Sequence, residues 1–454
     1  MSCNWPRVQI SEVCELIVDC VNKTAPRVDY ETPFKMLRTP NIKGGKISLN
    51  DCRFVEEDTY EKWTRRAKVL RDDVLLTREA PMGEVGIVDF DDTVFLGQRI
   101  MQYRVDRSQL DPHFLLYSFL SNDLQHQFNM HEGSGSVVSH IRVPDCSKFE
   151  LNLPPLTIQK EIAGVLKKLD RKITVNQQTN QTLEQMAQAI FKSWFVDFDP
   201  VKAKMNGEQP EGMDAATASL FPEKLVESEQ GLIPEGWVET PLYDIAEYIN
   251  GAAYKKFEPN NEGIGLPIVK IAELKAGITQ KTGFSKVDMP AKYRLEDNDM
   301  LFSWSGNPDT SIDTFVWALG EAWLNQHIFK VVPKSVLSRD YVLCLLKFMR
   351  PVFAEIARDK QTTGLGHVTV KDLKRLTVAL PSEELLIKFN EKVSAIIAQN
   401  FSLVKQNQNL EKLRDTLLPK LLSGEIELEI SKPLVEPIPW LPDLETSKQE
   451  AEAV

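Results

Sequence analysis

Two long stretches of the chain repeat apolar residues at alternating steps of three and four, which is the spacing of a coiled-coil seam. We expect the seam positions to be Leu166, Leu169, Ile173, Asn180, Leu183 and Ile190 in the first stretch and Val393, Ile396, Asn407, Leu410 and Leu417 in the second. Asn176 and Asn400 fall on the same steps. Buried asparagines cost stability but fix register, because each amide needs a partner across the interface.

The matched seams predict two long helices that pair with each other. The alternative is a pair of ordinary amphipathic helices, each packed on its own domain. Because a two-fold relation between repeats would make the pair antiparallel, we expect a rod about 60 Å long, at ~1.5 Å rise per residue. Such a rod would hold two globular regions apart.

A globular region precedes each seam. In the first, short apolar runs at 69–70, 74–76, 85–88 and 100–105 are broken by Gly, Asp and Pro, which is typical of short strands. A helical stretch follows at 112–128, then a Gly-Ser run at 132–136 and a last strand ending at Leu153. The second region runs likewise to Leu380, and Pro follows both leucines. The fold class that we predict is mixed α/β (α+β) in both regions.

The two regions are copies of one unit. Four segments of the first copy match segments of the second at an offset of 226 to 228: 73–77 with 299–303, 96–100 with 324–328, 110–116 with 337–343, and 139–141 with 366–368. A near-constant offset indicates a tandem duplication of about 190 residues.

The repeat divides the chain into six parts. We predict a first globular domain at 1–154, a first long helix at 155–197, a linker at 198–235, a second globular domain at 236–381, a second long helix at 382–424 and an acidic tail at 425–454. The linker is rich in Pro, Gly and Glu with little periodicity, so we interpret it as a crossing connection.

The net charge of the chain and the charge of its individual segments point to different functions. The formal net charge of -11 argues against nucleic-acid binding, which needs clustered Lys and Arg. However, residues 27–78 carry twelve basic against nine acidic residues, and residues 255–294 carry eight against four. Residues 425–454 hold eight acidic and two basic residues, so part of the acidity lies in a segment that need not face DNA.

Catalytic motifs are absent from the sequence. It contains no phosphate-binding loop, no dinucleotide fingerprint, no HExxH, no GxSxG and no zinc spacing, and its six cysteines are scattered. A metal site built from Asp145, Asp170 and Lys172 is conceivable, but solvated helix charges are the better interpretation of Asp170 and Lys172. No apolar stretch reaches about 18 residues, so we expect a cytoplasmic protein without a membrane segment.

Four segments resemble the conserved regions of Type I restriction-modification specificity subunits. They are LPPLTIQKEI at 153–162, MAQAIFKSWFVDFDP at 186–200, LIPEGW at 232–237 and LRDTLLPKLLSG at 413–424. The resemblance covers nearly the whole chain. It implies two target-recognition domains, each reading one half of a bipartite asymmetric DNA site, with the paired helices setting the gap.

The resemblance also implies partners. Two methyltransferase subunits would supply S-adenosylmethionine chemistry, and restriction subunits would add ATP- and Mg-dependent translocation and cleavage. This chain would bind none of these cofactors and would carry no catalytic residue. We further expect Trp194, Phe195 and Phe198 to dock partners on the outward faces of the helices.

Candidate DNA contacts come from the basic stretches and the loops. Arg is the usual reader of guanine and Asn of adenine, while Lys, Ser and Thr more often position phosphates. The candidates are Arg38, Lys43, Lys46, Arg65, Arg66, Arg78, Ser134, Ser136 and His140 in the first copy and Lys270, Lys275, Lys281, Ser305, Asn307, Thr362, Thr363 and His367 in the second. We rank highest the Gly-containing loops at 132–136 and 363–366, because glycine lets the backbone approach a phosphate closely.

Two other classes of function compete with this interpretation. A coiled-coil protein-protein adaptor explains the heptads and the acidity but not the locally basic stretches. A self-contained nuclease or methyltransferase would need a catalytic motif that the sequence does not contain. Salt-sensitive binding to duplex DNA would separate the specificity subunit from the adaptor.

Overall fold

The computed structural model describes residues 5–130, 140–229, 231–334, 339–361, 365–426 and 428. The chain forms two compact units, the first from residues 1–171 and 411–454 and the second from residues 172–410. Each unit is described by itself below. None of the helices within these ranges is both long enough and apolar enough to cross a membrane.

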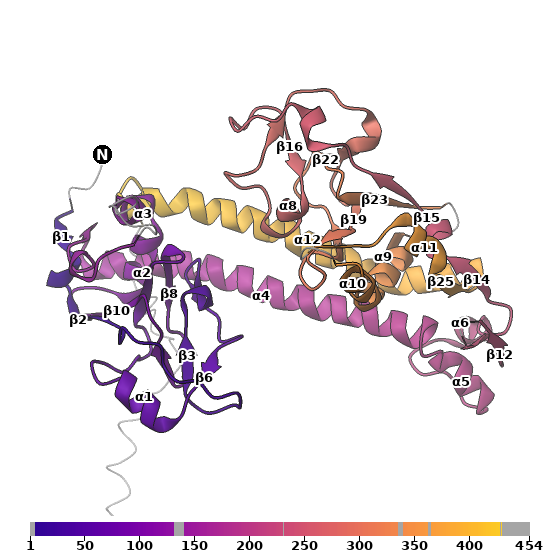
Figure 1. The fold of residues 1–454 in the computed structure, drawn as a ribbon, viewed down its shortest axis with the longest axis horizontal. Coiled ribbons are helices and arrows are strands. Elements are labelled where there is room, and N and C mark those ends of the chain that lie inside the picture. The colour runs from indigo at the N-terminus through magenta and orange to yellow at the C-terminus, as the bar shows by residue number, and fades with distance from the viewer. Residues whose placement is uncertain are drawn as a thin grey trace, which may run out of the picture. The chain divides into compact units, whose positions relative to one another are not determined.

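Unit 1 is built on an antiparallel four-stranded sheet. Its strand order is β2 (Cys14–Asp19), β10 (Ile100–Val105), β7 (Val74–Arg78) and β8 (Met82–Ile87). Helices α2 (Pro112–Leu120) and α3 (Asn122–Asn129) pack on β8 (Figure 1). The Asp111 carboxylate accepts hydrogen bonds of 3.0 Å from the backbone amides of His113 and Phe114, which fixes the start of α2.

Smaller elements complete unit 1. A second sheet has the order β6 (Arg53–Phe54), β3 (Lys35–Leu37) and β9 (Val94–Leu96), with β3 and β9 parallel. The other elements are the hairpin β4 (Ile42–Lys43) and β5 (Lys46–Ile47), α1 (Glu57–Trp63), the pair β1 (Arg7–Gln9) and β11 (Glu150–Asn152), and the 3-10 turns η1 (Ile10–Glu12), η2 (Thr39–Asn41) and η3 (Val143–Asp145).

Unit 2 repeats this topology. Its main sheet has the order β15 (Ala246–Asn250), β23 (Ile328–Pro333), β19 (Met300–Ser303) and β21 (Asp313–Val316), again antiparallel throughout. The parallel pair β16 (Leu266–Val269) and β22 (Ala322–Leu324) matches β3 and β9. The helices that follow are α9 (Arg339–Phe348) and α10 (Arg350–Asp359). The predicted mixed fold class and tandem duplication are therefore confirmed.

The remaining elements of unit 2 surround this sheet. They are β14 (Val238–Pro241) paired with β25 (Thr377–Leu380), β17 (Phe284–Ser285), β18 (Arg294–Leu295), β20 (Ser305–Gly306) paired with β24 (Gly366–His367), α7 (Leu242–Ile245), α8 (Ile271–Ala276), α11 (Val370–Arg375), η4 (Tyr254–Phe257) and η5 (Ala291–Tyr293).

Two 40-residue helices, α4 (Leu156–Phe195) and α12 (Glu383–Leu422), pack together antiparallel (Figure 1). The amide of Asn176 donates to Oδ1 of Asn407 at 2.8 Å, and the amide of Asn400 donates to the carbonyl of Asn180 at 3.0 Å. Residue number rises along one helix as it falls along the other, so the helices run in opposite directions. The predicted antiparallel pair is confirmed.

The heptad positions lie on the packed faces of these helices. Leu166, Ile173 and Val393 are at most 4% exposed, and Asn176 and Asn407 are also buried. The other predicted seam residues are half-buried, namely Leu169, Asn180, Leu183, Ile190, Ile396, Leu410 and Leu417. Asn407 also donates to the carbonyl of Ile173 at 3.4 Å, so the asparagine pair bonds both to itself and to backbone.

We predict opposite outcomes for single and double replacements of this pair. Asn176→Leu alone leaves Oδ1 of the buried Asn407 without its donor and is expected to cost about 1–3 kcal/mol, the desolvation of an unpaired oxygen. Asn407→Leu alone removes one acceptor of the Asn176 amide, which keeps Gln406 Oε1 at 2.7 Å, so we expect a smaller loss. The double variant removes both amides and is expected to recover most of the stability, as an apolar seam does. Chemical denaturation of the four proteins measures the cycle, and additive losses would contradict it.

The segment predicted to be a linker is folded. It contains α5 (Asp199–Met205), α6 (Ala215–Ser219) and the hairpin of β12 (Leu225–Ser228) and β13 (Gly231–Pro234). Val201 and Phe221 are 0% and 1% exposed in the main core of unit 2. The sequence analysis missed this because apolar residues so widely spaced show no period.

The aromatic residues near the end of α4 also differ from expectation. Trp194 and Phe195 are 5% and 7% exposed, and both pack in the core of unit 2. Phe198 is half-buried, with its ring 5.5 Å from that of Trp237. The prediction that these three residues dock partners is wrong, because the folded segment after α4 and the second globular region already cover them.

Candidate nucleic-acid interface

Basic residues of unit 1 gather at one edge of its main sheet. Strand β7 ends at Arg78, and the neighbouring antiparallel strand β10 begins at Ile100, directly after Arg99. Because antiparallel neighbours place the end of one strand beside the start of the next, Arg78 and Arg99 lie at the same edge. The backbone amide of Arg78 donates to the carbonyl of Arg99 at 2.8 Å.

The parallel pair β3 and β9 brings Arg38 to this edge. The amide of Gly97 donates to the carbonyl of Leu37 at 2.7 Å, and a Cβ on Gly97 would lie 2.6 Å from that oxygen. Only glycine therefore fits at position 97. Arg38 donates through Nη2 to the carbonyl of Asp51 at 2.8 Å. The hydroxyl of Thr39 donates to the carbonyl of Ala80, in the turn between β7 and β8, at 2.8 Å.

The hairpin that carries Lys43 and Lys46 is fixed on β8. Its two turn residues, Gly44 and Gly45, have φ of +56° and +87°, as a type I′ turn requires. The amide of Gly45 donates to the carbonyl of Val85 at 2.9 Å. Lys43 and Lys46 pair across the hairpin and are both exposed. Two lysines are thus held beside the β7–β8 turn.

The side chains of Arg78 and Arg99 differ in their partners. Arg78 donates through Nη1 to the carbonyl of Ile141 at 3.1 Å, and its buried Nε has no acceptor among the residues that the structure describes. Arg99 forms an ion pair of 3.1 Å with Glu79, and its side chain is 49% exposed. His140, the residue before Ile141, is half-buried at the same edge.

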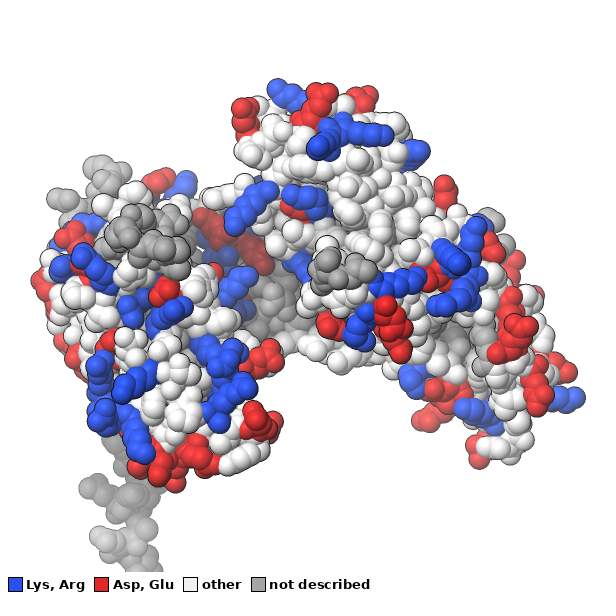
Figure 2. All heavy atoms as spheres, viewed as in Figure 1, with Lys and Arg blue, Asp and Glu red and all other residues white. Residues whose placement is uncertain are grey.

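The two other arginine candidates are placed less favourably. Arg66 forms an ion pair with Asp19, the last residue of β2, so its charge is already matched. Arg65 is exposed and donates to the carbonyl of Lys62 at 3.1 Å, close to the end of α1. Figure 2 shows Lys and Arg side chains over the part of unit 1 that holds β3, β6 and α1, with acidic side chains among them.

In unit 2, the matching edge carries aromatic and imidazole rings. Trp304 directly follows β19, and its ring lies 5.7 Å from that of His327 and 5.8 Å from that of His367. The Trp304 indole donates to Oδ1 of Asn250 at 3.3 Å. Nδ1 of His367 lies 2.9 Å from the hydroxyl of Ser305, which is buried. Burial, followed by the nearby His367, lowers the pKa of His327, which favours its neutral form.

The remaining candidates of unit 2 are dispersed. Nζ of Lys270 lies 5.0 Å from the Tyr254 ring centroid and 3.9 Å from the carboxylate of Glu273. Lys275 and Lys281 are exposed. Oδ1 of Asn307 accepts from the amides of Asp309 and Thr310 at 3.0 and 3.1 Å, so this oxygen stabilises a turn.

The loops ranked highest from the sequence fall mainly outside the described residues. Ser134, Ser136, Thr362 and Thr363 are among those left out. Gly366 is described and is buried, and a Cβ there would lie 2.1 Å from the carbonyl of Ala357. Its glycine is therefore required by packing against α10, and the phosphate approach expected of the loop at 363–366 stays a prediction.

The edge contains three residues that the sequence analysis did not select, namely Arg99, Trp304 and His327. A signal for two of them was present, since Arg99 and His327 occupy the same place in the repeated segments at 96–100 and 324–328. Trp304 directly follows the repeated segment at 299–303.

The carboxylates considered for a metal site are engaged elsewhere. Asp145 accepts from Arg142 at 2.8 Å and Lys148 at 3.2 Å. Asp170 accepts from the Tyr117 hydroxyl at 2.8 Å and from Arg414 at 2.9 Å. Asp170 is thus half-buried in a network, and its interpretation as a solvated charge is wrong. Within the described ranges, no group of three or more His, Cys, Asp or Glu side chains could hold a metal ion.

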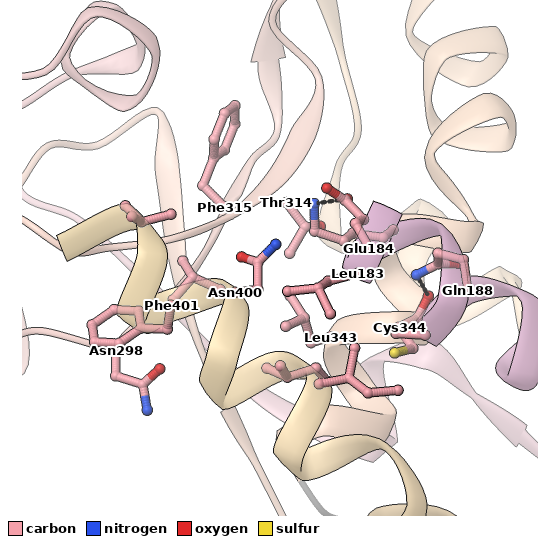
Figure 3. A pocket seen from close by; sticks show the side chains of 16 residues that line it. Leu183, Glu184, Gln188, Asn298, Thr314, Phe315, Leu343, Cys344, Asn400 and Phe401 are labelled. Atoms are coloured by element: carbon pink, nitrogen blue, oxygen red, sulfur yellow. Dashed lines mark hydrogen bonds and ion pairs between the residues drawn. The ribbon is translucent and has the colours of Figure 1, made fainter. Parts of the chain in front are cut away.

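Unit 2 also contains a cavity that none of the candidate DNA contacts lines (Figure 3). It has a volume of about 200 Å³ and lies between α4, α12, α9 and β21. Leu183, Leu343 and Phe401 contribute apolar surface, and the Gln188 amide donates to the carbonyl of Cys344 at 3.1 Å. Burial raises the pKa of the Cys344 thiol to about 12, so the thiol stays protonated.

Comparison with known proteins identifies one family. The profile described as "Type I restriction modification DNA specificity domain" matches twice, at residues 4–185 and 234–412. These two matches together cover more than half of the chain, and each spans one globular region with most of its long helix.

Individual relatives agree with the family match. The chain is 28% identical to the Type I restriction enzyme HindI specificity subunit of Haemophilus influenzae, over 85% of this chain and 94% of the relative. It is 22% identical to the EcoKI specificity subunit of Escherichia coli, over 93% and 89%. Among solved structures, the S subunit of a Type I restriction-modification system from M. genitalium has a TM-score of 0.52, with 18% identity over 92% of this chain and 96% of that one. That similarity supports the fold.

Proposed function

The chain belongs to the Type I restriction modification DNA specificity family, and from this premise we propose that each of its two units reads one half of a bipartite DNA site. The observation that carries the proposal is the repeated sheet edge. Both units place polar, basic or ring side chains at the ends of equivalent strands, β7 and β10 in unit 1 and β19 and β23 in unit 2. Arginine, lysine and aromatic groups held on strand ends suit contact with base edges and phosphates.

The long helices fit the role of a spacer. Paired helices resist bending better than an irregular connection, and the buried asparagines fix their register. A protein with two readers requires half-sites at a fixed separation, as symmetric dimers do. Because duplication within one chain lets the copies diverge, the two half-sites need not be related by symmetry. We propose that the site is asymmetric with a fixed unspecified gap.

In this proposal the chain is a non-catalytic subunit of a larger complex. The chain would assemble in the cytoplasm with two methyltransferase subunits and with restriction subunits. Adenine methylation with S-adenosylmethionine, and ATP- and Mg-dependent cleavage, would belong to those partners. The readers would be residues 1–154 and 236–381, and the spacer helices would be residues 155–197 and 382–424.

The adaptor interpretation explains less. It accounts for the paired helices and the net charge of -11. It gives no reason for Arg38, Arg78, Arg99 and two hairpin lysines to gather beside one sheet edge. An adaptor would also have no need for two copies of the same sheet with different side chains at the same edge.

Base-resolved methylation mapping of host DNA, with and without this gene, tests the proposal. We expect methylation to be lost at one bipartite motif, consisting of two different half-sites around a fixed gap, when the gene is deleted. Restoring the gene from a plasmid should restore the same motif. An unchanged methylome while the partner subunits are expressed would favour the adaptor.

A further inference from the structure

Equivalent backbone hydrogen bonds align the two units residue by residue at the sheet edge. In unit 1, the amide of Ile141 donates to the carbonyl of Arg78 at 3.0 Å. In unit 2, the amide of Val368 donates to the carbonyl of Trp304 at 2.8 Å. The offsets, 227 and 226, agree with the sequence repeat. Arg78 is therefore equivalent to Trp304, and His140 to His367.

A second pair of hydrogen bonds extends the alignment to a position that the sequence repeat did not reach. The amide of Gly97 donates to the carbonyl of Leu37 at 2.7 Å, and the amide of Asn325 donates to the carbonyl of Val269 at 3.2 Å. Leu37 and Val269 are the last residues of β3 and β16. Gly97 and Asn325 directly follow β9 and β22, the strands that pair in parallel with β3 and β16. The next residues, Arg38 and Lys270, are therefore equivalent.

The fourth equivalence follows from strand register. Arg99 directly precedes Ile100, which pairs with Thr77, and His327 directly precedes Ile328, which pairs with Ser303. We call these positions the reading quartet. Its members are Arg38, Arg78, Arg99 and His140 in unit 1 and Lys270, Trp304, His327 and His367 in unit 2.

The quartet of unit 1 contains three guanidinium groups, each held by a hydrogen bond or an ion pair. Nε of Arg38 and Nε of Arg78 are both buried without an acceptor in the described part of the chain. Each of these guanidiniums also makes one bond to a backbone carbonyl, Arg38 to Asp51 and Arg78 to Ile141, which holds it in place. Arg99 is held by Glu79 and is half exposed. The buried Nε atoms do not reach solvent, so contact with the two guanine acceptors, O6 and N7, falls to guanidinium nitrogens that reach the surface, as in the half-exposed Arg99.

The quartet of unit 2 has a different chemistry. It replaces two of the three guanidiniums by the Trp304 and His327 rings, and its one formal charge, on Lys270, already faces Glu273 and the Tyr254 ring. Nδ1 of His327 is buried and has no hydrogen-bond partner in the described ranges. An indole face and a neutral imidazole offer apolar contact and a single hydrogen bond, which do not reproduce the bidentate contact of arginine with guanine.

We propose that the reading quartet determines which bases each unit recognises, with Arg78 and Arg99 selecting guanine in the half-site of unit 1 and Trp304 and His327 selecting a different base pair at the equivalent place. The proposal rests on the function proposed above, because it assumes that each unit reads one half-site. It adds which residues read and why the two half-sites differ. The difference arises from side chains, since the strands that carry them are equivalent.

Substitution of Arg99 gives the sharpest test. Arg99 is half exposed and its ion pair with Glu79 lies near the surface, so Arg99→Gln should leave unit 1 folded. We expect the methylated motif to become relaxed at one guanine of one half-site, with discrimination there falling about tenfold or more. The other half-site and the gap should stay as in the wild type. His327→Gln should change only the other half-site.

Arg107→Gln is the matched control. Arg107 is also an exposed arginine of unit 1 in an ion pair, with Asp72 at 2.7 Å, but it follows the opposite end of β10. The Arg107→Gln variant should keep the wild-type motif. Thermal denaturation of each complex shows whether the variant subunit is folded.

The outcomes separate the two proposals. A wild-type strain without any bipartite motif would refute the proposed function itself. A wild-type motif that persists unchanged in both Arg99→Gln and His327→Gln would refute the reading quartet while leaving the function intact. A motif change as large in Arg107→Gln would also refute it, because the effect would then follow from charge alone.

Discussion

Replacing Asp73 by alanine is expected to destabilise unit 1 by about 3 kcal/mol, because the buried Gln102 amide and the partly buried Arg104 guanidinium both lose an acceptor. The Asp73 side chain is 1% exposed. It accepts from Arg104 Nε at 2.9 Å and Nη2 at 2.8 Å, and from the amide of Gln102 at 2.7 Å. The alanine variant would leave Arg104 and the buried Gln102 without their shared acceptor.

The duplication supplies a matched control at Asp299, the equivalent residue of unit 2. The Asp299 side chain is 20% exposed and pairs with Lys330 at 2.8 Å, without a second buried partner of the Gln102 kind. Asp299→Ala should cost about 1–2 kcal/mol, because solvent reaches both groups of this pair. Peptide-resolved hydrogen exchange in β7 and in β19 measures each unit separately. Equal losses in the two variants would contradict the burial argument.

A second large loss is expected from Phe389→Ala in α12. Phe389 is 0% exposed, and its ring lies 4.9 Å from that of Phe195 and 5.8 Å from that of Trp194. Deleting a buried aromatic ring removes its transfer free energy and leaves a cavity, so we expect a cost of about 3–5 kcal/mol. Since this cluster also packs against the segment after α4, hydrogen exchange should accelerate in α5 as well as in α12.

Ile387→Ala serves as the control two residues away on the same helix. Ile387 is 52% exposed, so its removal creates no cavity, and alanine has a high helix propensity. Denaturant unfolding should change by no more than about 0.5 kcal/mol. A similar loss for both variants would show that α12 is sensitive as a helix and that the aromatic cluster has no special part in its stability.

The sequence alone predicted the architecture of the helices and the duplication. Heptad spacing from Leu166 to Ile190 and from Val393 to Leu417 reports which face of a helix is buried, because that property depends on local periodicity. The repeat is visible in the sequence because both copies keep the apolar residues that their equivalent strands bury. Asparagines at seam positions indicated a partner helix, because a buried amide needs a hydrogen-bond partner across the interface.

The sequence predicted the candidate DNA interface only in part. Arg38, Arg78, His140 and His367 were selected as individual candidates, but nothing local indicated that Arg38 lies near Arg99. Parallel pairing of β3 with β9 brings these residues together across about 60 positions of the chain. The equivalence of Arg38 and Lys270 was hidden because the copies differ in length after this point: 35 positions separate Arg38 from Asp73 and 29 separate Lys270 from Asp299, so the offset is 232 here and 226 at the repeated segment.

Periodicity and repetition thus determined the elements of this protein, and tertiary packing determined the surroundings of each side chain. The segment at 198–235 looked like a linker because its apolar residues are few, yet Val201 and Phe221 are buried by elements distant in sequence. The sequence predicted Asp170 to be a solvated helix charge, but its carboxylate accepts hydrogen bonds from Tyr117 and Arg414. Burial and hydrogen bonding depend on contacts with residues that are distant in the sequence. A local sequence pattern does not indicate which distant residues those are.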